Sequence, residues 1–376
     1  MDAAYRVALL DWLACAAGGA GEPAARAAAS AADGLEGRVA ALGSAGHVLD
    51  FDDTYTPGLA HLSAPVAPAA LVLAAEIGAT AGQVLHAYAA GFESMAQLAR
   101  ANHPAMRERG WHPTATCGAV GAAAAAAGLL GLDAGRRRAA LRLALLATSG
   151  LRAAFGSDGK SLQVGAAAAA GVRAARLAAA GAATGAAVER GWERAYGARW
   201  VEPEPGGDAI RENWIKAYPC CLQTHGAIDA ALAARAAGAV PDTITVHPVS
   251  LTAAEIGDPA DGLEAKFSIP YLTAYTLTHG APTVASFAAA DPGVREAARA
   301  LTLSTDASLL ESEAVLSAGG EEVARVEAAI GSPRNPMTEK RLARKARDLA
   351  GDRLAAALDD PDRPAAELLS AVGAAR

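Results

Sequence analysis

Lysine, cysteine and aromatic residues are all scarce in this chain of 376 residues. Aromatic residues make up only 5% of it, which argues against a β-sandwich or β-barrel, because strands favour aromatic and β-branched side chains. The four cysteines lack the spacing of a disulfide framework or a metal site, so we expect a reducing, cytoplasmic environment. A formal net charge of −7 offers no basic surface to nucleic acid, and no nucleic-acid partner is expected.

Long hydrophobic runs are lacking too. The longest apolar run, residues 117–132, is shorter than the roughly 20 residues of a membrane-spanning helix, so no membrane segment is expected. The N-terminal apolar run is interrupted by Asp11 and has no basic segment before it, which is typical of a first core helix rather than of a signal peptide.

Only five of the 33 basic residues are lysine, namely Lys160, Lys216, Lys266, Lys340 and Lys345. Where arginine would serve for solubility, a retained lysine is a candidate for a compact ammonium group with an adjustable pKa. Lys340 and Lys345 lie on a predicted charged helix and are expected to be exceptions.

The 52% hydrophobic content, rich in alanine and glycine, predicts a mainly α-helical fold with closely packed helices. Segments with helical periodicity cover residues 4–18, 64–78, 81–102, 114–130, 135–149, 161–180 and 224–237. The pattern changes near Val240, where short strand-like segments alternate with helices. We predict a large all-helical domain over residues 1–238 and a smaller α+β lid domain over 239–335. A C-terminal helical segment over 336–376, capped by Thr338, is expected to pack back on the body.

The segment from His47 to His61 concentrates three aspartates and two histidines in an otherwise apolar region. If it is helical, His47, Asp50 and Thr54 share one face and line a cleft. His61 then returns towards that face after the following turn.

Four further polar segments each join a histidine, lysine or tyrosine to a predicted helix start. They are GWHPT with His112, GSDGKS with Lys160, WIKAYPCC with Lys216 followed by His225, and AKFSIPY with Lys266 and Tyr271. Each alone is more often structural than catalytic. Together, helix N-termini and cationic side chains favour a site for a small polycarboxylate, where a proton next to a carboxylate is removed. Dehydration, decarboxylation or epimerisation can follow.

Other classes of protein remain open on the residues alone. The aspartates could bind Mg²⁺, although no third aspartate follows Asp52 and Asp53 at the usual short spacing and no second acidic cluster is present. An iron–sulfur hydratase needs three suitably spaced cysteines, which are lacking. A non-catalytic scaffold is the remaining alternative.

The motifs HxLDFDDT, GWHPT, the glycine-rich lysine turn, WIKAYPCC and AKFSIPY occur in an order that resembles the MmgE/PrpD family over nearly the whole chain. The resemblance implies a helical domain with a smaller α+β lid, a homodimer, and a cytoplasmic lyase that uses neither metal nor cofactor. It implies dehydration of a hydroxy-polycarboxylate of the 2-methylcitrate kind, with decarboxylation or epimerisation of a small dicarboxylate as the alternatives.

Carried over motif by motif, the resemblance implies a site of Asp50, Thr54, His61, His112, Lys160, Lys216 and Tyr271. Of these, Asp50, His61, His112 and Lys216 are expected to be catalytic. Thr54, Lys160 and Tyr271, with Lys266 and His225 from their own segments, are expected to bind substrate. His112 or Asp50 would remove the proton, and His61 would protonate the leaving hydroxyl.

The sequence departs from the family's pattern at a few positions. Gln97 stands where an arginine is common, and Leu42-Gly43 replaces a common Asn-Gly. The chain also begins almost at the first core helix, so a leader segment is expected to be missing. These departures argue against 2-methylcitrate itself as the substrate.

Overall fold

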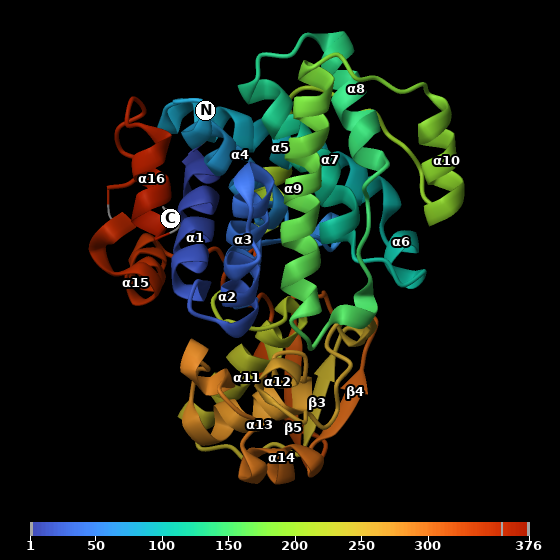
Figure 1. Cartoon of the computed structure of the whole chain (residues 1–376). Helices are drawn as coiled ribbons and strands as arrows, with labels where there is room; N and C mark the ends of the chain where they lie inside the picture. The colour runs from blue at the N-terminus through green and yellow to red at the C-terminus, as the bar shows by residue number, and fades with distance from the viewer. Residues whose placement is uncertain (1–2, 355, 374–376) are drawn as a thin grey trace. The chain divides into compact units, whose positions relative to one another are not determined.

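The structure is a computed structural model that describes residues 3–354 and 356–373. The chain forms two compact units (Figure 1). Unit 1 comprises Met1–Ala154, Asp158–Trp214 and Thr338–Arg376, and unit 2 comprises Phe155–Ser157 and Ile215–Met337. Within the described ranges, no helix is both long and apolar enough to cross a membrane.

Unit 1 is built from helices that pack around α7 and α9. The helices are α1 (Ala3–Gly19), α2 (Pro23–Ser30), α3 (Gly34–His47), α4 (Ser63–Glu76), α5 (Ala81–Asn102), α6 (Ala105–Glu108), α7 (Pro113–Leu129), α8 (Ala134–Leu145), α9 (Gly159–Ala179), α10 (Ala187–Tyr196), α15 (Glu339–Ala350) and α16 (Ala365–Val372). Short 3₁₀ turns are η1 (Thr56–Gly58), η2 (Arg152–Ala154), η3 (Ala209–Glu212) and η7 (Gly351–Leu354). β1 (Thr54–Tyr55) pairs antiparallel with β2 (Asn213–Trp214). The C-terminal helices α15 and α16 pack against α1 and α4 of the same unit.

Small residues let the central helices approach closely. On α7 every residue of Pro113–Ala127 is buried. A Cβ atom on Gly171 of α9 would lie 2.5 Å from the carbonyl oxygen of Ala119, and one on Gly121 would lie 3.0 Å from that of Gly91. The alanine-rich tract of α7 is therefore a buried helix in close contact with its neighbours, because only side chains of this size fit.

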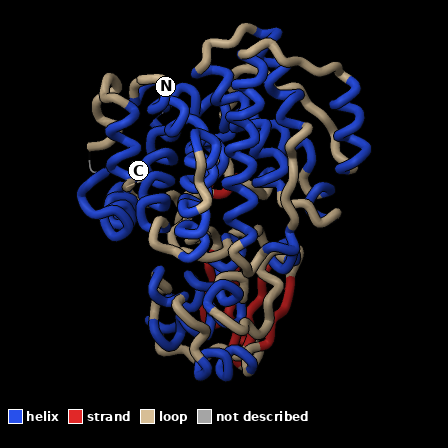
Figure 2. The backbone as a smooth tube through the Cα atoms, in the orientation of Figure 1, coloured by secondary structure: helices blue, strands red, loops and turns tan. Residues whose placement is uncertain are grey.

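Unit 2 combines helices with a four-stranded mixed sheet, which Figure 2 shows as the main group of strands. Its elements are η4 (Leu222–Thr224), α11 (His225–Ala236), β3 (Thr243–Val246), η5 (Pro248–Thr252), α12 (Gly262–Ala265), α13 (Ile269–His279), η6 (Val284–Phe287), α14 (Pro292–Arg299), β4 (Thr302–Thr305), β5 (Ala314–Ala318) and β6 (Glu321–Val326). The strand order is β4-β3-β5-β6, with β3 and β4 parallel and the other pairs antiparallel. Ile244 and Val246 of β3 face a core formed largely with the alanines of α11.

The prediction of a mainly helical chain with a small α+β part is confirmed. The helix expected over 81–102 has those bounds, and Thr338 caps α15 by accepting the backbone N–H of Arg341. Helices α2, α3, α6 and α10 were not predicted. By contacts, the longer segment of unit 2 begins at Ile215 and includes α11.

The close packing of α7 and α9 gives a first prediction. Gly171→Ala should lower the free energy of unfolding by about 1–3 kcal/mol, because the added methyl group overlaps backbone atoms of α7. The matched control is Gly128→Ala near the end of α7, where nothing lies within 4 Å of the added Cβ. This control should raise the stability by about 0.5–1 kcal/mol through helix propensity. Urea unfolding followed by circular dichroism measures both, and equal effects would contradict the packing argument.

Candidate active site

The acidic residues lie in a loop between α3 and β1, residues 48–53, which we call the acid loop. Helix α3 ends at His47, Asp50 has a left-handed φ of 54°, and Thr54 begins β1. The expected helical face shared by His47, Asp50 and Thr54 is therefore wrong. A left-handed residue ends the helical path, and aspartate is one of the few side chains that tolerate this conformation.

Asp50 forms a buried ion pair with Lys160. The Nζ atom of Lys160 lies 2.8 Å from Oδ1 of Asp50, and the two residues are 7% and 3% exposed. Lys160 is the second residue of α9, as expected for a lysine at a helix start. A single buried charge costs several kcal/mol, so this pairing is a condition for burying either group.

Asp52 lies between two histidines. Its Oδ2 atom is 2.8 Å from Nδ1 of His47 and 3.1 Å from Nδ1 of His61. Burial alone would raise the pKa of Asp52, but the charge interactions and hydrogen bonds of the two histidines hold that pKa well below its usual range. His61 therefore does return to the acid loop, where its Nε2 atom lies 3.8 Å from Oδ1 of Asp50.

Asp53 anchors the acid loop to two other elements. Its Oδ2 atom accepts hydrogen bonds from the hydroxyl of Ser63 on α4, at 2.6 Å, and from the amide of Asn213 on β2, at 2.7 Å. The hydroxyl of Ser63 is also 2.6 Å from that of Tyr88. Burial raises the pKa of Asp53 to about 7, although the two donors oppose this shift. We interpret Asp53 as a structural anchor.

Lys345 on α15 holds Phe51, the remaining residue of the DFDD motif. Its Nζ atom donates to the backbone carbonyl of Phe51 at 2.7 Å, lies 3.9 Å from the centroid of the Phe51 ring, and pairs with Asp11 at 2.7 Å. Lys345 is buried, so the expectation that it serves only solubility is wrong. The scarcity of lysine was the one signal in the sequence that could have identified it.

His112 is the N-cap residue of α7 and is 2% exposed. Its ring is 6.1 Å from that of His47, and its Nδ1 atom is 2.6 Å from the amide nitrogen of Gln163. Burial, and then the charge of Lys160 and the neighbouring histidines, lowers the pKa of His112 well below its usual value. The ring is therefore neutral at neutral pH. Gln163 had not been identified from the sequence.

Two threonines differ in their roles. The hydroxyl of Thr114 accepts the backbone N–H of His61 at 3.1 Å, which fixes the chain before α4 rather than capping α7. The Oγ1 atom of Thr54 is buried and has no hydrogen-bond partner among the described residues. Thr54 thus remains a candidate substrate-binding residue.

Unit 1 brings together five of the predicted site residues: Asp50, Thr54, His61, His112 and Lys160. Contacts join Lys160, Asp50 and His61 directly, and the ring of His47 lies 4.6 Å from that of His61. The other four predicted residues belong to unit 2 and are at most 6% exposed: Lys216, His225, Lys266 and Tyr271.

Within unit 2, the hydroxyl of Ser268 caps α13 by accepting the backbone N–H of Tyr271. The Tyr271 hydroxyl accepts the N–H of Asp291 at 2.9 Å, and burial raises the pKa of Tyr271. Lys266 Nζ lies 5.5 Å from the centroid of the Phe287 ring. These contacts orient Lys266 and Tyr271, and their roles as ligands of a substrate stay predictions.

One group of side chains in the described part of the chain has the composition of a metal site: His47, Asp52 and His61, whose donor atoms lie within 4.8 Å of one another. The short Nδ1 to Oδ2 distances are those of imidazole N–H groups facing a carboxylate. A metal ion would have to displace the protons of these contacts. The hydrogen bond between Nδ1 of His47 and Oδ2 of Asp52 accounts for one side of this cluster without a metal ion.

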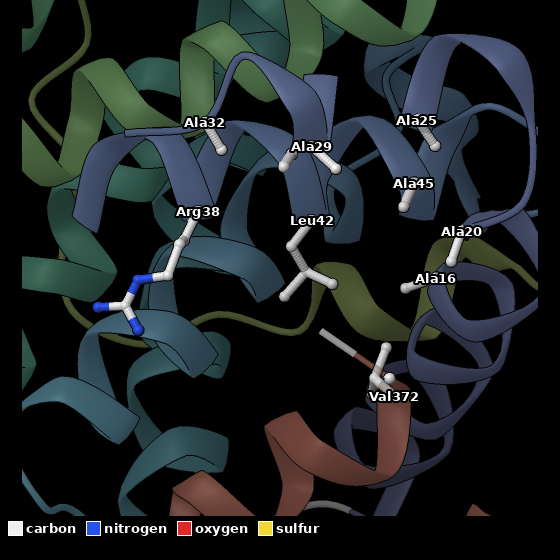
Figure 3. A pocket seen from close by; sticks show the side chains of 11 residues that line it. Ala16, Ala20, Ala25, Ala29, Ala32, Arg38, Leu42, Ala45 and Val372 are labelled. Atoms are coloured by element: carbon white, nitrogen blue, oxygen red, sulfur yellow. The ribbon is translucent and has the colours of Figure 1, made fainter. Parts of the chain in front are cut away.

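A separate pocket of about 200 Å³ opens between α1, α2, α3 and the end of α16 (Figure 3). Alanine side chains, with Leu42 and Val372, form most of its wall. The charged residue of this wall, Arg38, is paired with Glu76. The pocket offers no group suited to proton transfer, so the cluster around the acid loop is the better candidate for an active site.

Two protein-family models match this chain. The model of the MmgE/PrpD N-terminal domain matches residues 39–199, which include the acid loop, His112 and Lys160. The model of the MmgE/PrpD C-terminal domain matches residues 218–369, which begin just after Lys216. The chain belongs to the MmgE/PrpD family, which confirms the resemblance seen in the sequence.

The chain is also similar to human cis-aconitate decarboxylase. The two are 29% identical over 269 residues, a match that covers 65% of this chain and 56% of the human protein. This chain thus spans little more than half the length of that relative.

The lowered pKa values of His47 and His112 give a prediction about pH. Both rings are neutral in the folded chain, whereas unfolded histidine takes up a proton below about pH 6.5. The contribution of the two neutral rings to the free energy of unfolding is complete above that pH. It is lost as the pH falls, by up to about 1.4 kcal/mol per pH unit for each group. Asp53 acts in the opposite direction, because its raised pKa of about 7 lowers stability as the pH rises from about 4 to 7.

His112→Asn isolates one of these contributions, because Asp53 is common to variant and wild type. The asparagine oxygen can still accept from Gln163, and the loss of stability between pH 6.5 and 5 should become less steep (about 1 kcal/mol per pH unit or more). His86→Asn changes an exposed histidine on α5 and should keep the slope of the wild type. Thermal unfolding across this pH range measures the difference, and an unchanged slope in His112→Asn would contradict the neutral ring.

Proposed function

We propose that this chain is a cofactor-independent carbon–oxygen lyase that dehydrates a small hydroxy-polycarboxylate. The observation that carries the proposal is the buried cluster of unit 1, in which His61 and the Asp50–Lys160 ion pair lie in contact and His112 lies close by. Membership of the MmgE/PrpD family supports a polycarboxylate as substrate.

Dehydration next to a carboxylate needs a base, an acid and a positive charge. The base removes the proton and leaves an enediolate, the acid protonates the departing hydroxyl, and the cation stabilises the charge that develops. Imidazole side chains are suited to transferring protons and, when neutral, to donating a hydrogen bond. Lys160 supplies a buried ammonium group, whose field is strong where water is excluded.

Decarboxylation of an unsaturated tricarboxylate is the second candidate, because the curated relative is a cis-aconitate decarboxylase. That reaction uses the same cation and the same proton donor, but it needs no base to remove a proton. The presence of both His61 and His112 therefore favours dehydration, whereas the similarity to cis-aconitate decarboxylase favours decarboxylation. Homodimer formation, a cytoplasmic location, and the parts expected of Lys216, His225, Lys266 and Tyr271 stay predictions.

Incubation with a panel of hydroxy-polycarboxylates and with cis-aconitate, followed by mass spectrometry, tests both candidates. We expect loss of water from one hydroxy-acid, and turnover that persists in EDTA. Loss of carbon dioxide alone would replace the first candidate by the second. No conversion of any compound would contradict both, and inhibition by EDTA would point to a metal ion at His47, Asp52 and His61.

Variants of the two histidines test the site. His61→Asn and His112→Asn should each lower kcat by about 10²–10⁴-fold, the range of a lost general acid or base. His86→Asn is the matched control and should turn over like the wild type, because His86 is exposed on α5 and bonds only to a backbone carbonyl, at 2.8 Å. Full activity of both active-site variants would show that the reaction occurs elsewhere.

A further inference from the structure

Gln163 contacts the backbone of Leu151 and the ring of His112 at the same time. It lies on α9 one turn after Lys160. Its Oε1 atom accepts the backbone N–H of Leu151 at 2.8 Å, and its Nε2 atom donates to the Leu151 carbonyl at 3.2 Å. The same Nε2 atom lies 2.6 Å from Nδ1 of His112.

These contacts determine which way the amide points. A backbone N–H can only donate and a carbonyl can only accept, so a flipped amide would lose both bonds to Leu151. The Nε2 atom, which carries two hydrogens, therefore faces His112. It can use one hydrogen for the Leu151 carbonyl and the other for Nδ1 of the ring. An Nδ1 atom that accepts a hydrogen bond carries no proton, so the neutral ring of His112 holds its proton on Nε2.

The opposite arrangement holds at His61. Its Nδ1 atom faces Oδ2 of Asp52 at 3.1 Å, and an ionised carboxylate only accepts. A proton on Nδ1 of His61 would face this carboxylate, which would leave Nε2, on the side of Asp50, as the nitrogen that can accept a proton. One ring thus faces an amide donor through Nδ1 and the other faces a carboxylate acceptor through Nδ1, so both present Nε2, protonated in His112 and unprotonated in His61.

The backbone around Leu151 is itself fixed relative to His112. The N–H of His112 donates to the carbonyl of Gly150 at 3.1 Å, and that of Arg152 donates to Gly110 at 2.9 Å. Gly150 has a φ of 118°, and a Cβ atom there would lie 2.6 Å from the side chain of Ala115. Glycine is required at this position, and it brings Leu151, and with it the amide of Gln163, up to the ring.

We propose that Gln163 is a positioning residue that keeps His112 in the Nε2–H tautomer, so that the neutral ring donates a hydrogen bond to the substrate oxygen on which negative charge develops, while His61 is the general base. This rests on the proposed function, in which a proton next to a carboxylate is removed. It reverses the roles expected from the sequence, where His112 or Asp50 removed the proton and His61 protonated the leaving group.

The tautomer can be measured without any substrate. In the full-length protein labelled with [¹⁵N]histidine, long-range ¹H–¹⁵N NMR at neutral pH distinguishes a protonated ring nitrogen from an unprotonated one. Comparison with His112→Asn assigns the signals. We expect Nδ1 of His112 to be unprotonated and Nε2 to carry the proton. Protonation at Nδ1 in the wild type would overturn the proposal.

Gln163→Glu provides the matched perturbation, because it replaces the donating amide by a carboxylate of the same shape. The proton of His112 should move to Nδ1, and kcat should fall by at least about ten-fold with KM changed less than about three-fold. The control is Gln97→Glu, since the amide of Gln97 bridges the backbone N–H and carbonyl of Glu204 in the same way, at 3.0 and 2.9 Å. Gln97 contacts no histidine through these bonds, and its variant should keep both tautomer and kcat.

The outcomes separate this proposal from the proposed function. A tautomer that stays unchanged in Gln163→Glu overturns the positioning role. A tautomer that changes without any fall in kcat overturns the assignment of His112 as the hydrogen-bond donor to the substrate. If the wild type converts no polycarboxylate while the tautomer is as expected, the proposed function fails and the positioning of the ring by Gln163 stands.

Discussion

Each residue from Asp50 to Asp53 is held by at least one other element of unit 1, and the candidate site depends on this constraint. Lys160 of α9 pairs with Asp50, Lys345 of α15 binds the carbonyl of Phe51, His47 of α3 and His61 face Asp52, and Ser63 and Asn213 bind Asp53. Three carboxyl groups are buried within four residues. Such a loop is stable only when its charges are paired, since removing one partner of a buried ion pair costs about 3–5 kcal/mol.

The composition of the chain explains how so many polar groups fit in one place. Alanine and glycine allow the helices to approach closely, and the interior leaves little freedom for the ionisable side chains that it does contain. Burial then keeps the imidazoles of His47 and His112 neutral, whereas the interactions of Asp52 with His47 and His61 keep its carboxylate charged. Four of the five lysines are buried, and Lys340 is the exposed one. Buried lysine ammonium groups thus lie among buried carboxylates, whereas among the described residues Arg107 is the only buried arginine.

Local signals in the sequence predicted most of the fold, and tertiary contacts determined what they missed. The helix over 81–102 and the Thr338 cap follow from periodicity and capping chemistry. The acid loop could not be predicted, because the partner that Asp50 takes is 110 residues away. Gln163 gave no signal for the same reason: its importance comes from Leu151 and His112, which only the fold brings together. The order of the polar motifs was sufficient to identify the family.

The central claim is that the cluster at the acid loop makes and breaks a carbon–hydrogen bond next to a carboxylate. The most direct test is incubation with an unsaturated tricarboxylate in D₂O, with NMR and mass spectrometry of the product. Hydration and decarboxylation both place a solvent deuteron on that carbon. The account predicts one deuterium there with the wild type and none with His112→Asn over the same time. Conversion by the wild type without deuterium at that carbon would contradict the account.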